Sequence, residues 1–203
     1  MKVEEILRQY SRYFISERYA EPFSRGLLGL EQNWVGPLKD NEGVYETLKL
    51  FQKMEKAATP QELLNWRFQQ GLYRAYYDAY IKARLHYETY LENQARKVLR
   101  KADQIGAIKA VGEAEAILDK AVKQKVKPEW RARVFELAEA LFQSIRMQLS
   151  VKKYQAIMVR RGANLDNIDK PLNDRRDLKR DFIKILSLQS EKERLDAIAE
   201  MLD

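Results

Sequence analysis

The residue types best suited to hold a ligand lie close together in one stretch, where aromatic rings alternate with polar and charged side chains. An aromatic ring stacks on the apolar face of a sugar, while nearby amide, carboxylate and guanidinium groups bind hydroxyls. The same rings would stack on nucleobases, or they would fill the seams between helices with their hydroxyls reaching the surface. The members of this ligand-binding candidate set are Asn65, Trp66, Arg67, Tyr73, Arg74, Tyr76, Tyr77, Asp78 and Tyr80.

Asp78 is the carboxylate of this set for which we expect burial, because the sequence YRAYYDAY surrounds it with aromatic residues. Arg74 precedes it by four residues, which places both side chains on one helical face. We therefore predict a structural ion pair of Asp78 with Arg74, or with an arginine from another helix, in preference to direct contact of Asp78 with a ligand.

A second polar region is the irregular segment 162–174, which is rich in residues typical of turns. Long loops inside compact domains often carry function, so this loop adds three ligand-binding candidates. Basic residues flank the same loop and offer an alternative site for nucleic acid or another anionic partner. Several aspartates lie among them, and local neutralisation of charge is the simpler explanation. The loop candidates are Asn164, Asp166 and Asn173, and the basic candidates are Arg160, Arg161, Arg175, Arg176 and Lys179.

The sequence offers little of what most catalytic sites need. His86 is the only histidine, and there is no cysteine. One histidine cannot supply the pair of Glu-x-x-His motifs of a di-iron bundle, and neither a nucleophile elbow nor a P-loop is present. We therefore predict no catalytic residue, no metal site and no cofactor, and we lean against enzymatic activity for this chain alone.

The candidate residues of the aromatic stretch lie on one long predicted helix, over about 60–102. Thr59 and Glu62 form a capping box, Pro60 occupies the first helical position, and the next proline is Pro128. Apolar residues recur in steps of three and four along this helix, which is the pattern of a face turned toward a core. A helix of this length would be the central element of the fold.

Other segments also show helical periodicity, and none shows the alternation of a strand. After Pro128, apolar residues at helical spacing predict a helix that ends at Arg161 at the latest. Gly26 and Gly29 would allow a close approach to the long helix. We predict an all-α fold in which about seven or eight helices form an irregular bundle, as a single domain over 1–203 with a possible internal boundary near 104–112.

Composition and charge limit the classes of protein, the partners and the locations that are compatible with this chain. Hydrophobic residues make up 45% and charged residues 33% of the 203 residues, which excludes a disordered chain. The net charge of +7 makes an anionic partner worth testing. No apolar run is long enough for a membrane span and no signal peptide is visible, so we expect a soluble protein without a membrane partner, cytoplasmic by default.

Four segments, 6–34, 65–92, 130–151 and 160–179, together span most of the chain. These segments resemble a helical region of large, poorly characterised bacterial proteins that look like glycoside hydrolases. This resemblance implies a helical accessory module that packs on, or helps to line, a carbohydrate-active catalytic domain and contributes to oligosaccharide binding. No catalytic barrel lies within the 203 residues, and the basic net charge does not follow from the resemblance. A stand-alone protein that binds nucleic acid or another anion and a purely structural helical oligomer are the alternatives.

Overall fold

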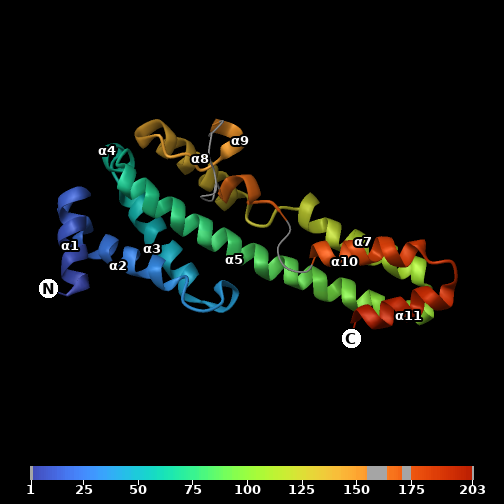
Figure 1. The fold of residues 1–203 in the computed structure, drawn as a ribbon. Helices are drawn as coiled ribbons and strands as arrows, with labels where there is room; N and C mark the ends of the chain where they lie inside the picture. The colour runs from blue at the N-terminus through green and yellow to red at the C-terminus, as the bar shows by residue number, and fades with distance from the viewer. Residues whose placement is uncertain (1, 155–163, 171–174, 203) are drawn as a thin grey trace. The chain divides into compact units, whose positions relative to one another are not determined.

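The computed structural model describes residues 2–154, 164–170 and 175–202, and within them every regular element is a helix. The predicted all-α multi-helix fold is confirmed (Figure 1). The described helices do not include one that is long and apolar enough to cross a membrane. Contacts along the chain divide it into a first unit, Met1–Ala83 with Lys127–Ile168, and a second unit, Arg84–Val126 with Asp169–Asp203. The single domain predicted from the sequence stays a prediction.

The first unit contains most of the helices. They are α1 (Val3–Phe14), α2 (Ala20–Gln32), α3 (Gly43–Ala57), α4 (Pro60–Leu63), the beginning of α5 (Trp66–Leu99), α8 (Pro128–Ile145) and α9 (Val151–Tyr154), with short 3-10 turns at Glu17–Tyr19, Leu38–Asp40 and Asn164–Asn167.

The core of the first unit is built on aromatic rings from three helices. Phe23 of α2 lies 5.8 Å from Phe51 of α3 and 5.9 Å from Phe68 of α5, measured between ring centroids. Gly26 and Gly71 make room for Phe51, because a Cβ atom on either glycine would lie within 3 Å of its ring. The close approach that we predicted for Gly26 is therefore made to α3, and Gly29 likewise faces Thr47 of α3.

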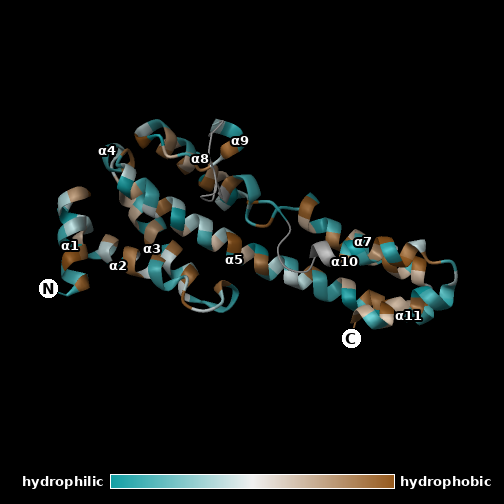
Figure 2. Ribbon diagram, viewed as in Figure 1, coloured by the Kyte–Doolittle hydropathy of each residue, from teal (hydrophilic) through white to brown (hydrophobic). Residues whose placement is uncertain are grey.

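The second unit has its own apolar core. It is formed by the end of α5, α6 (Ala102–Ile105), α7 (Ala107–Lys123), α10 (Arg175–Ser187) and α11 (Glu191–Leu202). Leu118 of α7, Phe182 of α10 and Ile198 of α11 are buried together with a row of alanines from α5 and α7. Hydrophobic and hydrophilic residues are interspersed along α7, α10 and α11 (Figure 2), as expected for helices that bury one face.

The long predicted helix is present, but it is shorter than expected at both ends. α4 ends at Leu63, and α5 begins at Trp66 after a break in which the Asn65 side chain accepts a hydrogen bond from the backbone N–H of Arg67 at 3.0 Å. Asparagine is a favoured helix cap, and it starts a new helix here. At the other end, α5 stops at Leu99 and the chain continues into α6.

The helix after Pro128 also ends earlier than the sequence suggests. α8 stops at Ile145 because Arg146 adopts a left-handed conformation with φ of 57°. The backbone N–H groups of Arg146 and Met147 bond back to Phe142 and Leu141, at 3.0 and 3.4 Å. A helix that ends in a left-handed conformation usually has glycine at that position. The arginine at position 146 therefore does not indicate the end of the helix.

Candidate functional site

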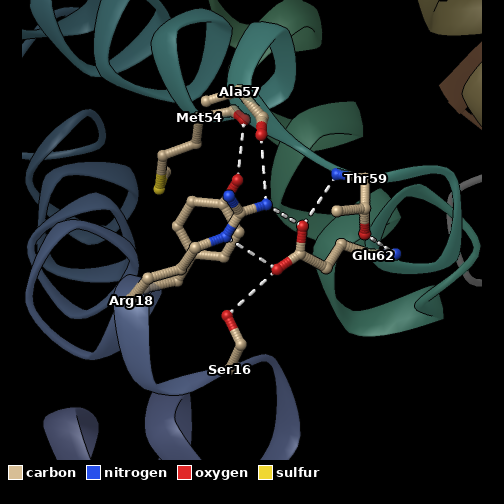
Figure 3. Close-up of polar contacts among 7 residues, drawn as sticks. Ser16, Arg18, Met54, Ala57, Thr59 and Glu62 are labelled. Carbon is tan, nitrogen blue, oxygen red and sulfur yellow. Dashed lines mark hydrogen bonds and ion pairs between the residues drawn. The ribbon is translucent and has the colours of Figure 1, made fainter.

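The capping box predicted at Thr59 is confirmed, and it belongs to a larger polar cluster (Figure 3). The Thr59 backbone N–H donates to Glu62 at 2.8 Å, and Ser16 Oγ donates to the same carboxylate at 3.1 Å. Arg18 pairs with Glu62 and also donates to the carbonyl of Ala57 at 3.0 Å. The guanidinium of Arg18 and the other donors hold the pKa of Glu62 down at about 2. The polar groups of this cluster bond to one another. The cluster therefore has a structural role, which is to hold the end of α3 and α4 against the segment that follows α1.

The predicted ion pair between Arg74 and Asp78 is present, with Nε of Arg74 2.9 Å from a carboxylate oxygen of Asp78. Asp78 is fully buried, and its other oxygen accepts hydrogen bonds from Asn33 at 3.1 Å and from the Trp34 indole N–H at 3.2 Å. Burial raises the pKa of Asp78, and these three partners partly offset that rise. Asp78 therefore anchors the end of α2 to α5 and fixes the position of Arg74.

A groove in the first unit passes beside Arg74 and has a volume of about 530 Å³. This volume is within the usual range of small-molecule sites, roughly 300–1,000 Å³. Helix α5 contributes a largely polar lining, while α2 and the segment after α8 contribute apolar side chains. The lining residues are Arg67, Gln70, Gly71, Tyr73 and Arg74 of α5, Phe23, Leu27 and Leu30 of α2, Tyr10 of α1, and Met147 and Leu149.

Arg67 and Arg74 are the two cations of this groove, and both guanidinium groups lie over aromatic rings. The guanidinium of Arg67 lies 4.0 Å from the ring of Phe14 and 4.2 Å from that of Trp66. The guanidinium of Arg74 lies 4.8 Å from the ring of Trp34. The two arginines are seven positions apart, so they share one helical face about 10 Å apart along the axis.

The charges of these arginines are balanced differently. Asp78 neutralises Arg74, whereas Arg67 has no carboxylate partner among the residues described here. The groove therefore carries an uncompensated positive charge at Arg67, next to apolar side chains. An anionic group on a ligand with an apolar face would find complementary chemistry at this place.

Tyr73 adds a polar group that has no partner. Its ring is 6% exposed, and its buried hydroxyl has no hydrogen-bond partner in the described structure. Burial raises the pKa of this hydroxyl, which therefore stays protonated and able to donate. A buried hydroxyl without a partner costs free energy, and a ligand that reaches it would recover that cost.

The remaining residues of the aromatic stretch do not form one open surface with Arg67, Tyr73 and Arg74. Tyr80 is fully buried and therefore belongs to the core, against the expectation of an exposed ligand-binding ring. Tyr76 points to α3, where its hydroxyl donates to Glu55 at 2.7 Å and its pKa is raised by burial to about 12. Asn65 donates to the carbonyl of Phe14 at 2.5 Å, and the ring of Tyr77 stacks on Tyr73.

The loop candidates fall largely outside the described residues. Asn173 and the side chain of Asn164 are among the parts that the structure leaves undescribed. Asp166 is described, and it accepts hydrogen bonds from Ser150 Oγ at 2.6 Å and from the backbone N–H of Val151 at 2.7 Å. These bonds lower the pKa of Asp166 and cap α9, which is a structural role.

The basic candidates are described only in part. Arg160 and Arg161, and the side chains of Arg175 and Arg176, lie outside the described residues. The ammonium group of Lys179 forms an ion pair with Asp119 and lies 3.7 Å from Glu115. Lys179 is therefore neutralised within the second unit by two acidic residues of α7, which are not among the aspartates on which the prediction of local neutralisation was based.

Sequence reasoning missed the apolar half of the groove. Leu27, Leu30 and Leu149 resemble ordinary core residues in the sequence, because each follows the helical periodicity of its segment, and Met147 lies outside that periodicity. Only the Arg67, Gln70 and Arg74 spacing, which places three polar side chains on one face, could have indicated the groove. Comparison of the chain with protein-family models, curated proteins and solved structures found no match.

Proposed function

We propose that this chain is a non-catalytic helical binding module and that the groove of its first unit binds an acidic oligosaccharide. The observation that carries the proposal is the pair Arg67 and Arg74, which share one face of α5 at the edge of an apolar groove. Arg67 keeps its positive charge uncompensated within the described structure. A sugar carboxylate would form a bidentate, charge-assisted pair with this guanidinium.

The other lining groups suit the remaining parts of such a ligand. Leu27 and Leu30 offer an apolar surface to the C–H face of a sugar ring, and Gln70 and Tyr73 offer hydrogen bonds to its hydroxyls. A neutral sugar would use the same contacts but leave Arg67 unpaired. This difference favours an acidic sugar over a neutral one.

The accessory role is part of the same proposal. It rests on the resemblance of the chain to a helical region of bacterial proteins that look like glycoside hydrolases. In that setting the module would hold an acidic polysaccharide beside a catalytic domain. Nucleic acid, the alternative anionic partner, receives less support, because Lys179 is already paired with acidic residues.

Isothermal titration calorimetry with an oligogalacturonate and a neutral cello-oligosaccharide tests the proposal. We expect binding of the acidic sugar only, and Arg67→Gln should weaken it by about 1.5–3 kcal/mol, the usual value of a hydrogen bond to a charged group. Arg25→Gln is the matched control, because Arg25 lies on α2 in the same unit but lines a different groove with residues of α3. Equal affinities for both sugars, or equal losses in both variants, would refute the proposal.

A further inference from the structure

A second groove of the first unit is formed by α2 and α3. Its volume is about 440 Å³, which lies within the usual range of small-molecule sites. It shares no lining residue with the groove that contains Arg67 and Arg74. One residue of α2 and five residues of α3 line it, and they are Arg25, Glu46, Thr47, Lys49, Leu50 and Lys53.

Positive charge predominates in this groove. Arg25, Lys49 and Lys53 are exposed cations, and Glu46 is the one carboxylate of the lining. Among the described residues, Arg25 and Lys53 have no ion pair. Glu46 reaches Lys49 only at 3.8 Å, and both side chains are more than 70% exposed, with values of 76% and 77%. An exposed contact of this length is weak, so the groove keeps an excess of positive charge.

Other acidic side chains close to these cations in the sequence are engaged elsewhere. Glu21 lies one turn before Arg25, but it pairs with an arginine of α1 at 2.5 Å. Glu55 lies two residues after Lys53, but it pairs with an arginine of α8 at 2.6 Å. The acidic side chains outside the described structure all belong to the second unit, and they are Asp174, Asp177 and Asp203.

Thr47 adds a polar group that is available to a ligand. The residue is 7% exposed and lines the groove, and its hydroxyl makes no hydrogen bond within the described structure. Gly29 of α2 faces this hydroxyl, and a Cβ atom at position 29 would lie 2.6 Å from Thr47 Oγ1. The absence of a side chain at Gly29 therefore leaves the hydroxyl in place. Polar groups buried to this extent normally have a partner, and its lack here indicates a ligand.

The number of cations favours a phosphate group over a carboxylate. A phosphate monoester has a charge of about −1.5 to −2 at pH 7 and three strong acceptor oxygens. These oxygens can accept hydrogen bonds from a guanidinium, two ammonium groups and a hydroxyl at once. A carboxylate has two oxygens and a single charge, which one guanidinium satisfies. A groove with three cations from two helices therefore matches the phosphate better.

We propose that this groove is a second ligand site, which binds a small phosphate monoester such as a sugar phosphate. Arg25 and the two lysines, which lie one turn apart on α3, neutralise the phosphate. Thr47 donates a hydrogen bond to one of its oxygens, and the partly buried Leu50 contacts the carbon skeleton of the ligand. Because the two grooves share no residue, the phosphate site does not depend on the binding of an oligosaccharide.

Isothermal titration calorimetry of the whole chain with glucose 6-phosphate, glucuronate and glucose tests the proposal. We expect glucose 6-phosphate to bind most tightly, and Lys53→Gln should weaken this binding about tenfold, because one hydrogen bond to a charged group is lost. Lys152→Gln is the matched control, since Lys152 is an exposed lysine of the first unit that does not line the groove. Absence of binding, glucuronate binding as tight as that of glucose 6-phosphate, or equal losses in both variants would overturn the proposal.

Glu46→Gln gives a second test in the opposite direction. Removal of the one carboxylate from the lining should tighten the binding of glucose 6-phosphate severalfold, because a like charge no longer faces the phosphate. Damage to the fold cannot produce such a gain. Glu31→Gln is the control, because it removes an exposed carboxylate of α2 that does not line the groove, and it should leave the affinity unchanged. Weaker binding by Glu46→Gln, or equal gains in both variants, would contradict a phosphate site at this groove.

Discussion

At the scale of single residues, the first unit uses buried polar groups to fix side chains rather than to react. Asp78 is the centre of a buried polar cluster, in which it accepts hydrogen bonds from Asn33 and Trp34 and forms an ion pair with Arg74. It determines which way the Arg74 guanidinium extends into the groove. The geometry of the proposed ligand site therefore depends on a carboxylate that the ligand does not touch.

Removal of this carboxylate should be costly. Asp78→Ala leaves the donors of Asn33 and Trp34 without an acceptor, and we expect the free energy of unfolding to fall by about 1–3 kcal/mol. Urea denaturation followed by circular dichroism measures this loss. Asp196→Ala, at an exposed position of α11, is the control and should change stability by less than about 0.5 kcal/mol. A loss no larger than that of the control would show that Asp78 has no anchoring role.

The dependence of stability on acid pH should reveal two carboxyl groups whose pKa values are shifted in opposite directions. The pKa of Glu62 is lowered to about 2 by Arg18, so the stability that ionised Glu62 provides is complete above about pH 4.5 and is lost as pH falls toward 2. The pKa of Asp78 is raised by burial, so its protonation in the folded state stabilises the protein as pH falls. Glu62→Gln should therefore flatten the loss of stability in acid, and Asp78→Asn should make it steeper.

Urea denaturation at several pH values between 2.5 and 6 measures these slopes. Glu46→Gln is a suitable control, because Glu46 is exposed and its contact with Lys49 is long, at 3.8 Å. The control should leave the slope of the wild type unchanged. Slopes that change in the same direction in the Glu62 and Asp78 variants would contradict the assignment of opposite pKa shifts.

At the scale of helices, packing decides the effect of a glycine. Gly71→Ala adds a Cβ atom 2.7 Å from the Phe51 ring and 3.3 Å from that of Phe23, both in the core. Overpacking of this kind costs about 1–3 kcal/mol and exceeds the gain in helix propensity, which is about 1 kcal/mol. We expect Gly71→Ala to lower the melting temperature.

Gly112→Ala is the matched control for this prediction, because Gly112 lies inside α7 and a Cβ atom there meets nothing within 4 Å. The same substitution should therefore raise the stability by about 0.4–1 kcal/mol. Differential scanning calorimetry of the two variants compares them directly. A rise in melting temperature for both variants would mean that the Phe51 ring moves aside without cost.

The elements of this fold were largely accessible from the sequence, because their ends carry local signals. The capping box predicted at Thr59 is present, and a second one joins Ser190 and Glu193 by hydrogen bonds of 2.9 and 3.2 Å. The end of α8 could not be predicted, because Arg146 adopts a left-handed conformation that is unusual for arginine. The Arg74–Asp78 pair depends on spacing along one helix and was predicted. The groove depends on contacts among segments far apart in the chain, so Leu27 and Met147 could not be assigned to it.

At the scale of the whole molecule, the chain consists of two units that share one continuous helix. Residues 66–83 of α5 belong to the first unit and residues 84–99 to the second. Each unit has a core of its own, around Phe51 in the first and around Leu118 in the second. Because a helix segment owes most of its stability to its own packing, we expect each core to set the unfolding of its own part of α5.

The tryptophans allow a direct test of this independence. Trp34, Trp66 and Trp130 are the three tryptophans of the chain, and all lie in the first unit, so fluorescence reports on that unit while circular dichroism reports on both. Leu118→Ala should remove about 2–5 kcal/mol from the second unit, as expected for a buried leucine. We expect the circular dichroism transition to move or split and the fluorescence midpoint to stay in place. The converse substitution, Leu72→Ala in the core of the first unit, should lower the fluorescence midpoint. Coincident shifts of both signals in both variants would instead show that α5 couples the two cores into one cooperative fold.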